Sequence, residues 1–379
     1  MKLTTAGESH GKALVAIIEG LPSHLRIESE KINGALALRQ SGFGRGARQK
    51  IEKDSVEILS GVRNGETLGS PLALCIYNKD FVNWESCMSA ENCDESVMQA
   101  KRLTKVRPGH ADLAGMLKFA QTDARNILER ASARETAIRV AAGEVYKNYL
   151  SALGIEISGY VYEVCGIKDG GRYAFNELAR AKTTALGMLD EETEKRAIEK
   201  ISALQSAGDT AGGGVEIRVK GLKSGFGSVM SYAEKLDAQL AQSLMSIQAV
   251  KGVEIGAGFS VAEKSGKEIH DEIFFDEARG FYRNTNRAGG IEGGMSNGEE
   301  VLLRVAMKPI PTLMQGLKTV DFTDKSEAVA AAERSDVCAI FALEIIAEAA
   351  VAEVLANAVS KRLGGDTMQE VIERYNRLP

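Results

Sequence analysis

Several residue types are scarce in this chain, and each shortage excludes a class of protein. The 379 residues include only six prolines, which argues against long disordered linkers. The five cysteines are odd in number and have no paired short spacing of the kind that a zinc site needs: Cys75, Cys87, Cys93, Cys165 and Cys338. We see no secretory leader and no apolar run of transmembrane length. These absences predict a compact protein of the reducing cytoplasm that holds no metal.

Charge is also nearly balanced. The chain carries 47 basic and 52 acidic residues, a net charge of -5, which gives no support for a nucleic-acid or anionic-membrane partner. The hydrophobic share of 44% and the charged share of 26% are ordinary for a globular protein. Any basic site must therefore be local, and a small molecule is the expected partner.

The apolar pattern alternates between strand and helix periods along the whole chain. Residues 55–77 predict strands joined by a turn at Asn64–Gly65, and residues 155–165, 213–222, 252–262 and 299–311 predict further strands. Helical spacing starts at residue 111, breaks near Glu129 and restarts at Ser132, where Ser132 and Glu135 predict a capping box. Residues 190–204 predict an exposed helix, 232–246 another, and 336–362 a long apolar helix closed by two glycines.

No segment has the composition of a linker, and sheets and long helices interleave in two rough halves. We therefore predict an α+β fold that forms one domain over residues 1–379 with an internal pseudo-repeat.

Four loops rich in glycine and arginine or lysine stand out, at residues 39–50, 105–112, 281–299 and 308–312. Glycine lets backbone N–H groups approach an anion, and arginine presents a fork of donors that matches phosphate or carboxylate. The loops together indicate a ligand with several negative charges. The alternative for any one loop is a set of turn glycines beside solvated arginines. None of the loops satisfies a dinucleotide or Walker phosphate motif.

Histidine is the side chain most easily placed as a proton donor or acceptor near neutral pH, and the chain has only four. His10 and His110 lie in glycine-flanked loops, where each is either catalytic or makes a structural hydrogen bond. His24 and His270 lie in polar surroundings and are expected at the surface.

Two further residues have competing interpretations. Ser132 can cap a helix or support an anion bound at the same helix end, beside Arg130 and Arg134. Asp336 can be an N-cap of the long apolar helix or a base.

Taken together, "GESHG" (7–11), "RPGHAD" (107–112), "SARETAIRVAAG" (132–143) and "RSDVCAI" (334–340) resemble the signature segments of chorismate synthase. The resemblance extends to residues 51–74, 245–259, 286–299 and 308–312, so it covers nearly the whole chain. It implies a carbon–oxygen lyase that converts 5-enolpyruvylshikimate 3-phosphate to chorismate and phosphate by 1,4-elimination, with reduced FMN that is not consumed. It also implies a homotetramer whose subunit places long helices between two antiparallel four-stranded sheets.

The resemblance assigns roles to individual residues. His110 would donate to the departing phosphate, His10 would serve the flavin, Asp336 would act near flavin N5, and Ser9 and Ser132 would support the site. Arg48, Arg107 and Arg134 would bind substrate. The residues implied in cofactor binding are Arg39, Arg45, Arg130, Ala131, Ser132, Gln248, Ala249, Gly293, Lys308, Pro309, Ile310, Pro311, Thr312 and Arg334. Arg39 and Arg45 match positions associated with NADPH, a possible source of the reduction.

Two positions depart from the commonest family pattern. Ala131 stands where serine is usual, and Gln248 stands where asparagine is frequent, so only backbone contacts carry over at these two points.

Two other classes compete with the lyase. A flavin oxidoreductase would pass hydride from NADPH to a substrate and consume it. A non-catalytic anion- or RNA-binding protein would use the arginine loops, but the acidic net charge and the lack of interleaved aromatic residues count against it.

Overall fold

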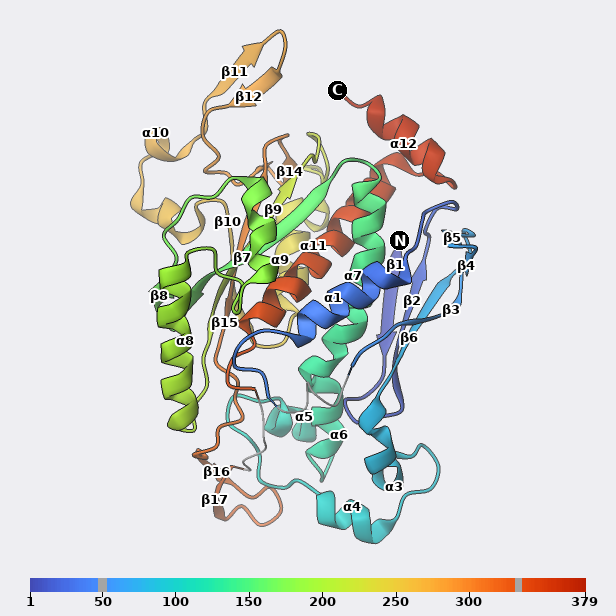
Figure 1. Ribbon diagram of the computed structural model, residues 1–379, viewed down its shortest axis with the longest axis vertical. Helices are drawn as coiled ribbons and strands as arrows, with labels where there is room; N and C mark the ends of the chain where they lie inside the picture. The colour runs from blue at the N-terminus through green and yellow to red at the C-terminus, as the bar shows by residue number, and fades with distance from the viewer. Residues whose placement is uncertain (47–52, 331–335) are drawn as a thin grey trace.

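Two antiparallel sheets account for most of the strands in this computed structural model, which describes residues 1–46, 53–330 and 336–379 (Figure 1). The first sheet has the order β1 (Lys2–Ala6), β2 (Ala13–Glu19), β6 (Leu72–Tyr77) and β3 (Glu57–Ser60). The second has the order β10 (Val250–Ile255), β15 (Val301–Met307), β9 (Gly213–Lys220), β7 (Glu156–Val164) and β8 (Ile167–Lys168). The second sheet thus has five strands where the resemblance implied four, because the two-residue β8 pairs with the end of β7.

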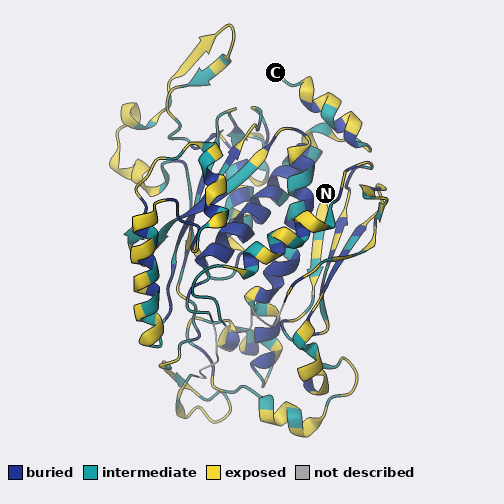
Figure 2. Cartoon of the chain, viewed as in Figure 1, coloured by how far each residue is buried: buried dark blue, intermediate teal, exposed yellow. Residues whose placement is uncertain are grey.

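The helices α7 (Thr136–Ser151) and α11 (Ile340–Leu363) lie between these sheets. Helix α7 packs on β1, β2 and β6, helix α11 packs on β7, β9 and β15, and the two helices pack on each other. Helix α1 (Ser29–Gln40) contacts both. The predicted helical face at residues 137, 140, 141, 145 and 149 is buried, and buried positions line the facing sides of both long helices (Figure 2). One hydrophobic core includes residues of both sheets.

Shorter elements surround this core. Four two-stranded ribbons pair β4 (Val62–Arg63) with β5 (Glu66–Thr67), β11 (Ile273–Asp276) with β12 (Gly280–Arg283), β13 (Ile291–Glu292) with β14 (Met295–Ser296), and β16 (Lys318–Val320) with β17 (Glu327–Val329). The remaining helices of the described residues are α3 (Glu85–Met88), α4 (Glu95–Lys101), α5 (Asp112–Lys118), α6 (Arg125–Ala131), α8 (Glu191–Ser206), α9 (Leu236–Met245), α10 (Gly266–Ile269) and α12 (Met368–Asn376). The 3-10 helices are η1 (Lys79–Asn83), η2 (Ala133–Glu135), η3 (Phe175–Thr183), η4 (Tyr232–Glu234) and η5 (Gly258–Glu263).

Local signals predicted several of these elements. Asn64 and Gly65 have φ angles of 51° and 77°, as a type I′ turn between β4 and β5 requires. Helix α11 ends at Leu363 and is followed by Gly364, whose φ of 58° suits glycine at a helix end. The strand predicted over 252–262 stops at Ile255, because the positive φ of Gly256 starts a turn that leads into η5.

The predicted capping box is wrong. Ser132 accepts a hydrogen bond from the backbone N–H of Arg134 and opens η2, while the Glu135 side chain accepts from Thr5 instead of reaching back to Ser132. Among the helices that the structure describes, none is long and apolar enough to cross a membrane.

Candidate active site

The loop between β1 and β2 carries Ser9 and His10. Gly7 begins it with a φ of 114°, and a Cβ there would lie 2.4 Å from a backbone oxygen of β2, so only glycine fits. The backbone N–H of Ser9 donates to the carbonyl oxygen of Glu129 on α6, at 2.9 Å. The side-chain amide of Asn78, just after β6, donates to two carbonyl oxygens of the loop. The loop is therefore fixed by elements far away in sequence.

The imidazole of His10 lies against a buried carboxylate. Its Nδ1 is 2.9 and 3.0 Å from the two carboxylate oxygens of Glu129, and its backbone N–H donates to the same group. Burial alone would raise the pKa of Glu129, but the hydrogen bonds from His10 and the charge of Arg125 lower it overall. The Trp84 ring covers one face of the imidazole, with ring centroids 4.0 Å apart.

His110 has a carboxylate partner in its own loop. Its Nδ1 lies 2.5 Å from Asp112 Oδ1, and Asp112 is 1% exposed. Arg107 donates to the same carboxylate from Nε and Nη2 and from its backbone N–H. Burial would raise the pKa of Asp112, but the hydrogen bonds from His110 and Arg107 hold it well below its usual range. An ionised carboxylate only accepts, so the 2.5 Å contact with Asp112 favours a proton on Nδ1 of His110, and this contact is shorter than the 3.2 Å between Nδ1 and Arg107 Nη2.

The segment from Lys308 to Thr312 lies beside the His110 loop. The ammonium of Lys308 donates to the carbonyl oxygen of Gly109, and its backbone N–H donates to Ala249. Thr312 Oγ1 accepts from Arg107 at 3.5 Å. Burial, with a smaller contribution from the charge of Lys251, lowers the pKa of Lys308. Two predicted cofactor segments and one predicted substrate residue are thus in contact.

Buried arginines link these loops to the helix layer. Arg134 donates to Asp54 at 2.7 Å and to Asn78 at 2.9 Å, so it shares Asn78 with the His10 loop. Arg39 donates to the hydroxyl of Thr136 and to the carbonyl oxygen of residue 133. Burial, with Arg45 and Arg134 nearby, lowers the pKa of Arg39 to about 9, which leaves it charged at neutral pH.

Asp336 lies 3.3 Å from Arg45, between carboxylate and guanidinium, and accepts from the backbone N–H of Gly46 at 2.6 Å. Helix α11 begins four residues later and has no side-chain cap, so the N-cap interpretation of Asp336 is wrong. Two predicted site residues, Arg48 and Arg334, lie outside the described residues.

Arg130 and Gln248 are both linked to Thr5 of strand β1, Arg130 directly and Gln248 through Glu135. Arg130 is half exposed and donates to the hydroxyl and carbonyl oxygens of Thr5 and to the carbonyl oxygen of Gly7. Gln248 donates to Glu135, whose carboxylate also accepts from Thr5. Ser132 and Ala131 connect Arg130 to η2.

Gly293 does not join the other predicted residues within this chain. It forms the turn between β13 and β14, whose neighbour Gly294 accepts a hydrogen bond from Leu236 of α9. Figure 1 shows β14 at the upper end of the molecule and α5 and α6 at the lower end. The flavin contact that the resemblance implies for Gly293 therefore stays a prediction.

The sequence analysis missed four residues that hold the site together: Asp54, Asn78, Trp84 and Glu129. Asp54, Asn78 and Glu129 form hydrogen bonds with residues at least 56 positions away, and the ring of Trp84 contacts His10, 74 positions away. No local sequence pattern therefore predicts these contacts. Asp112 was visible in the "RPGHAD" segment, where its spacing from His110 was the available signal.

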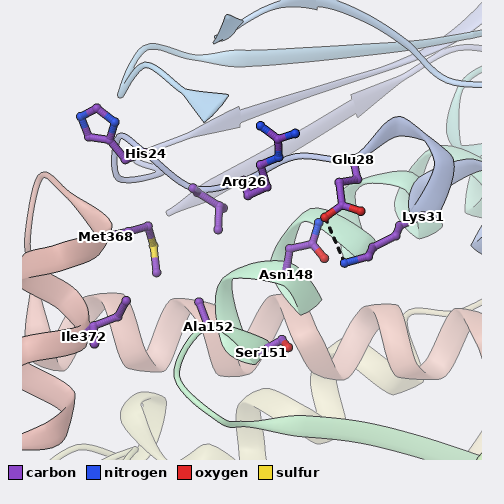
Figure 3. Close-up of a pocket in the computed structure, with 10 residues that line it drawn as sticks. His24, Arg26, Glu28, Lys31, Asn148, Ser151, Ala152, Met368 and Ile372 are labelled. Carbon is purple, nitrogen blue, oxygen red and sulfur yellow. Dashed lines mark ion pairs between the residues drawn. The ribbon is translucent and has the colours of Figure 1, made fainter. Parts of the chain in front are cut away.

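Two pockets lie outside the two histidine loops. The first, of about 240 Å³, lies between α7, α12 and the segment from His24 to Lys31, where Glu28 and Lys31 form an ion pair (Figure 3). The second, of about 220 Å³, is lined by Leu3, Thr5, Glu135, Arg139 and Glu353. Thr5 and Glu135 also contact Arg130 and Gln248, so this second pocket borders on predicted cofactor residues.

The chain matches known proteins from end to end. The family model for chorismate synthase matches residues 1–360. A chorismate synthase of Caldicellulosiruptor bescii is 50% identical, over 100% of this chain and 99% of that protein, and one of Geobacter sulfurreducens is 52% identical, over 99% and 97%. A crystal structure of chorismate synthase is 38% identical, covers 99% of this chain and 96% of its own, and superimposes with a TM-score of 0.78. The chain therefore belongs to the chorismate synthase family and is a lyase of the shikimate pathway.

Proposed function

We propose that the two histidine loops and the arginines around them form the active site for elimination of phosphate from 5-enolpyruvylshikimate 3-phosphate with reduced FMN. One observation carries this proposal: each loop histidine has its Nδ1 on a buried carboxylate. Such a pairing fixes the ring and leaves Nε2 as the atom that faces a ligand. The two exposed histidines differ, since the side chain of His24 is 70% exposed and His270 is exposed.

His110 would be the general acid. Asp112 orients its ring, so that Nε2 can deliver a proton to the leaving phosphate oxygen. Arg107 and Lys308 lie within the same loop cluster and supply positive charge for the substrate's anionic groups. Arg134 and Arg48 complete the proposed substrate-binding set.

Reduced FMN, when bound, supplies electron density that promotes departure of the phosphate. The residues fit such a group, because Gln248 Oε1 is buried without a hydrogen-bond partner in the described chain and suits an N–H donor. His10, Ser9, Arg130, Ala131, Ser132, Ala249 and the 308–312 segment would hold it, with Arg39 and Arg45 as the proposed NADPH contacts. Asp336, fixed by Arg45 and Gly46, would accept and release a proton near flavin N5.

The larger assembly is part of the same proposal. We propose one domain over residues 1–379, long helices between two sheets with an internal pseudo-repeat, a homotetramer and a cytoplasmic location. The packing of α7 and α11 on opposite sheets supports the layered description. A tetramer also gives Gly293 a place, since it could contact flavin in a neighbouring copy.

The test is an anaerobic assay of the purified protein with 5-enolpyruvylshikimate 3-phosphate and chemically reduced FMN, following chorismate absorbance. We expect one phosphate per chorismate, and no net consumption of NADPH when it is added to the same assay. Stoichiometric NADPH consumption would favour the flavin oxidoreductase instead. No chorismate would contradict the proposal.

A further inference from the structure

Glu129 is a buried carboxylate that the reaction as proposed does not use. It lies on α6, is 3% exposed, and contacts three polar groups of the His10 loop. Its carbonyl oxygen accepts from Ser9, and its carboxylate accepts from both the backbone N–H and Nδ1 of His10.

The side-chain and main-chain contacts have different consequences. The bond from Ser9 to the carbonyl oxygen anchors the loop and persists whatever side chain stands at position 129. Only the carboxylate can determine which imidazole nitrogen carries the proton, because an ionised carboxylate accepts and never donates. The lowered pKa of Glu129 keeps it ionised at neutral pH.

We propose that Glu129 is a positioning residue that fixes the Nδ1–H tautomer of His10 and leaves Nε2 toward the ligand. This role rests on the proposed function of His10. Arg125, on the same helix, donates to the carboxylate at 3.3 Å and holds it in place. Trp84 covers the imidazole ring, and Lys101 and Arg125 lie over the Trp84 ring at 3.8 and 4.8 Å from its centroid. The imidazole is therefore restrained at its edge and on one face.

The test is the ring nitrogen spectrum of the histidines in the protein without substrate or flavin. With only four histidines, ¹⁵N labelling resolves each ring, and loss of one set of signals in His10→Gln assigns His10. We expect the wild-type spectrum at alkaline pH to show neutral His10 protonated on Nδ1. In Glu129→Gln we expect a mixture of tautomers. Glu66→Gln, which removes the exposed partner of His24, is the matched control and leaves the His10 signals unchanged.

Turnover gives a second measurement. We expect Glu129→Gln to lower kcat at least about tenfold, in line with impaired general acid–base or flavin support, and Glu129→Asp to recover part of that loss. A wild-type His10 protonated on Nε2 overturns the inference, and that measurement needs no variant to fold. Because the spectrum does not depend on turnover, the tautomer result stands or falls separately from the proposed lyase activity.

Discussion

His10 and His110 are both held through Nδ1 by a buried carboxylate, but the carboxylates reach them by different routes. Asp112 is two residues from His110 in the same loop, and the motif that contains both is visible in the sequence. Glu129 comes from a separate helix, 119 residues from His10. The comparison shows that one chemical arrangement can be encoded locally or only through the fold.

The two carboxylates also differ in their cationic partners. Arg107 donates to Asp112 from two side-chain nitrogens, at 2.8 and 3.1 Å, whereas Arg125 donates once to Glu129, at 3.3 Å. Removal of Asp112 would therefore break contacts to both a buried guanidinium and an imidazole. Removal of the Glu129 charge leaves Arg125 with another acceptor, the carbonyl oxygen of Lys101. We expect the locally encoded site to be the more sensitive to loss of its acid.

The largest expected effect is on folding of the Asp112→Ala variant. Removing Asp112 breaks its buried ion pair with Arg107, at a cost of about 3 to 5 kcal/mol in the free energy of unfolding, measured by chemical denaturation. Since the folded pKa of Asp112 is lowered, its contribution is present above the ordinary value of 3.8 and is lost as the pH falls. The difference in unfolding free energy between variant and wild type should therefore become smaller in acid. A gap under about 1 kcal/mol at pH 7 would contradict the comparison.

Turnover should depend on His110 and should not depend on the exposed His270. We predict that His110→Ala lowers kcat at least about a hundredfold because it removes the proposed acid, with circular dichroism unchanged. Asp336→Ala should also lower kcat at least about a hundredfold, because it removes the carboxylate proposed to accept and release a proton. His270→Ala, an exposed histidine, is the control and should keep wild-type turnover. Near-normal rates for His110→Ala would remove its proposed role.

Much of the scaffold could be predicted from sequence because its signals are local. Apolar spacing identified α7 and α11, alternation identified β7 and β9, and Asn64–Gly65 identified a turn. The misplaced features depend on three-dimensional neighbours. The Glu135 side chain turns to Thr5, which defeats the capping box, and Asp336 turns to Arg45 instead of capping α11.

The site followed the same rule. The sequence identified the histidines and arginines by residue type and Asp112 by its place in the same motif as His110, but not the more distant groups that orient them. The His10 loop contacts Glu129, Trp84 and Asn78, which are all far from it in the sequence. No short sequence spacing therefore predicts these contacts. Gly293, implied by the family resemblance, lies in the turn between β13 and β14. Residue chemistry was therefore predictable, and long-range pairing was not.

A third buried carboxylate, Glu344, differs from Asp112 and Glu129 because it shares its cationic partner, Lys182, with a second acid, Glu348. Lys182 contacts both Glu344 and Glu348, and Lys147 lies 2.5 Å from Glu348. Burial and the neighbouring Glu348 raise the pKa of Glu344 from 4.5 to about 8. Because the folded state retains this proton, stability falls as the pH rises from about 4.5 to about 8.

Glu344→Gln should remove that dependence. Between pH 5 and pH 8 we expect wild type to lose at least about 1 kcal/mol of unfolding free energy relative to the variant. Denaturant titrations at closely spaced pH values measure the difference. Parallel curves for the two proteins would show that Glu344 is already ionised in the fold.

The smallest expected effect separates packing from hydrogen bonding at His10. Trp84→Leu removes the ring that covers the imidazole at 4.0 Å but leaves the Glu129 carboxylate in place. We predict a loss in kcat of less than about tenfold, since ring contacts contribute only about 0.5 to 1.5 kcal/mol beyond burial. The Nδ1–H tautomer of His10 should be unchanged in the ¹⁵N spectrum. If Trp84→Leu shifted the tautomer as much as Glu129→Gln, face packing, and not the distant carboxylate, would set the protonation of His10, and the contrast with His110 would fail.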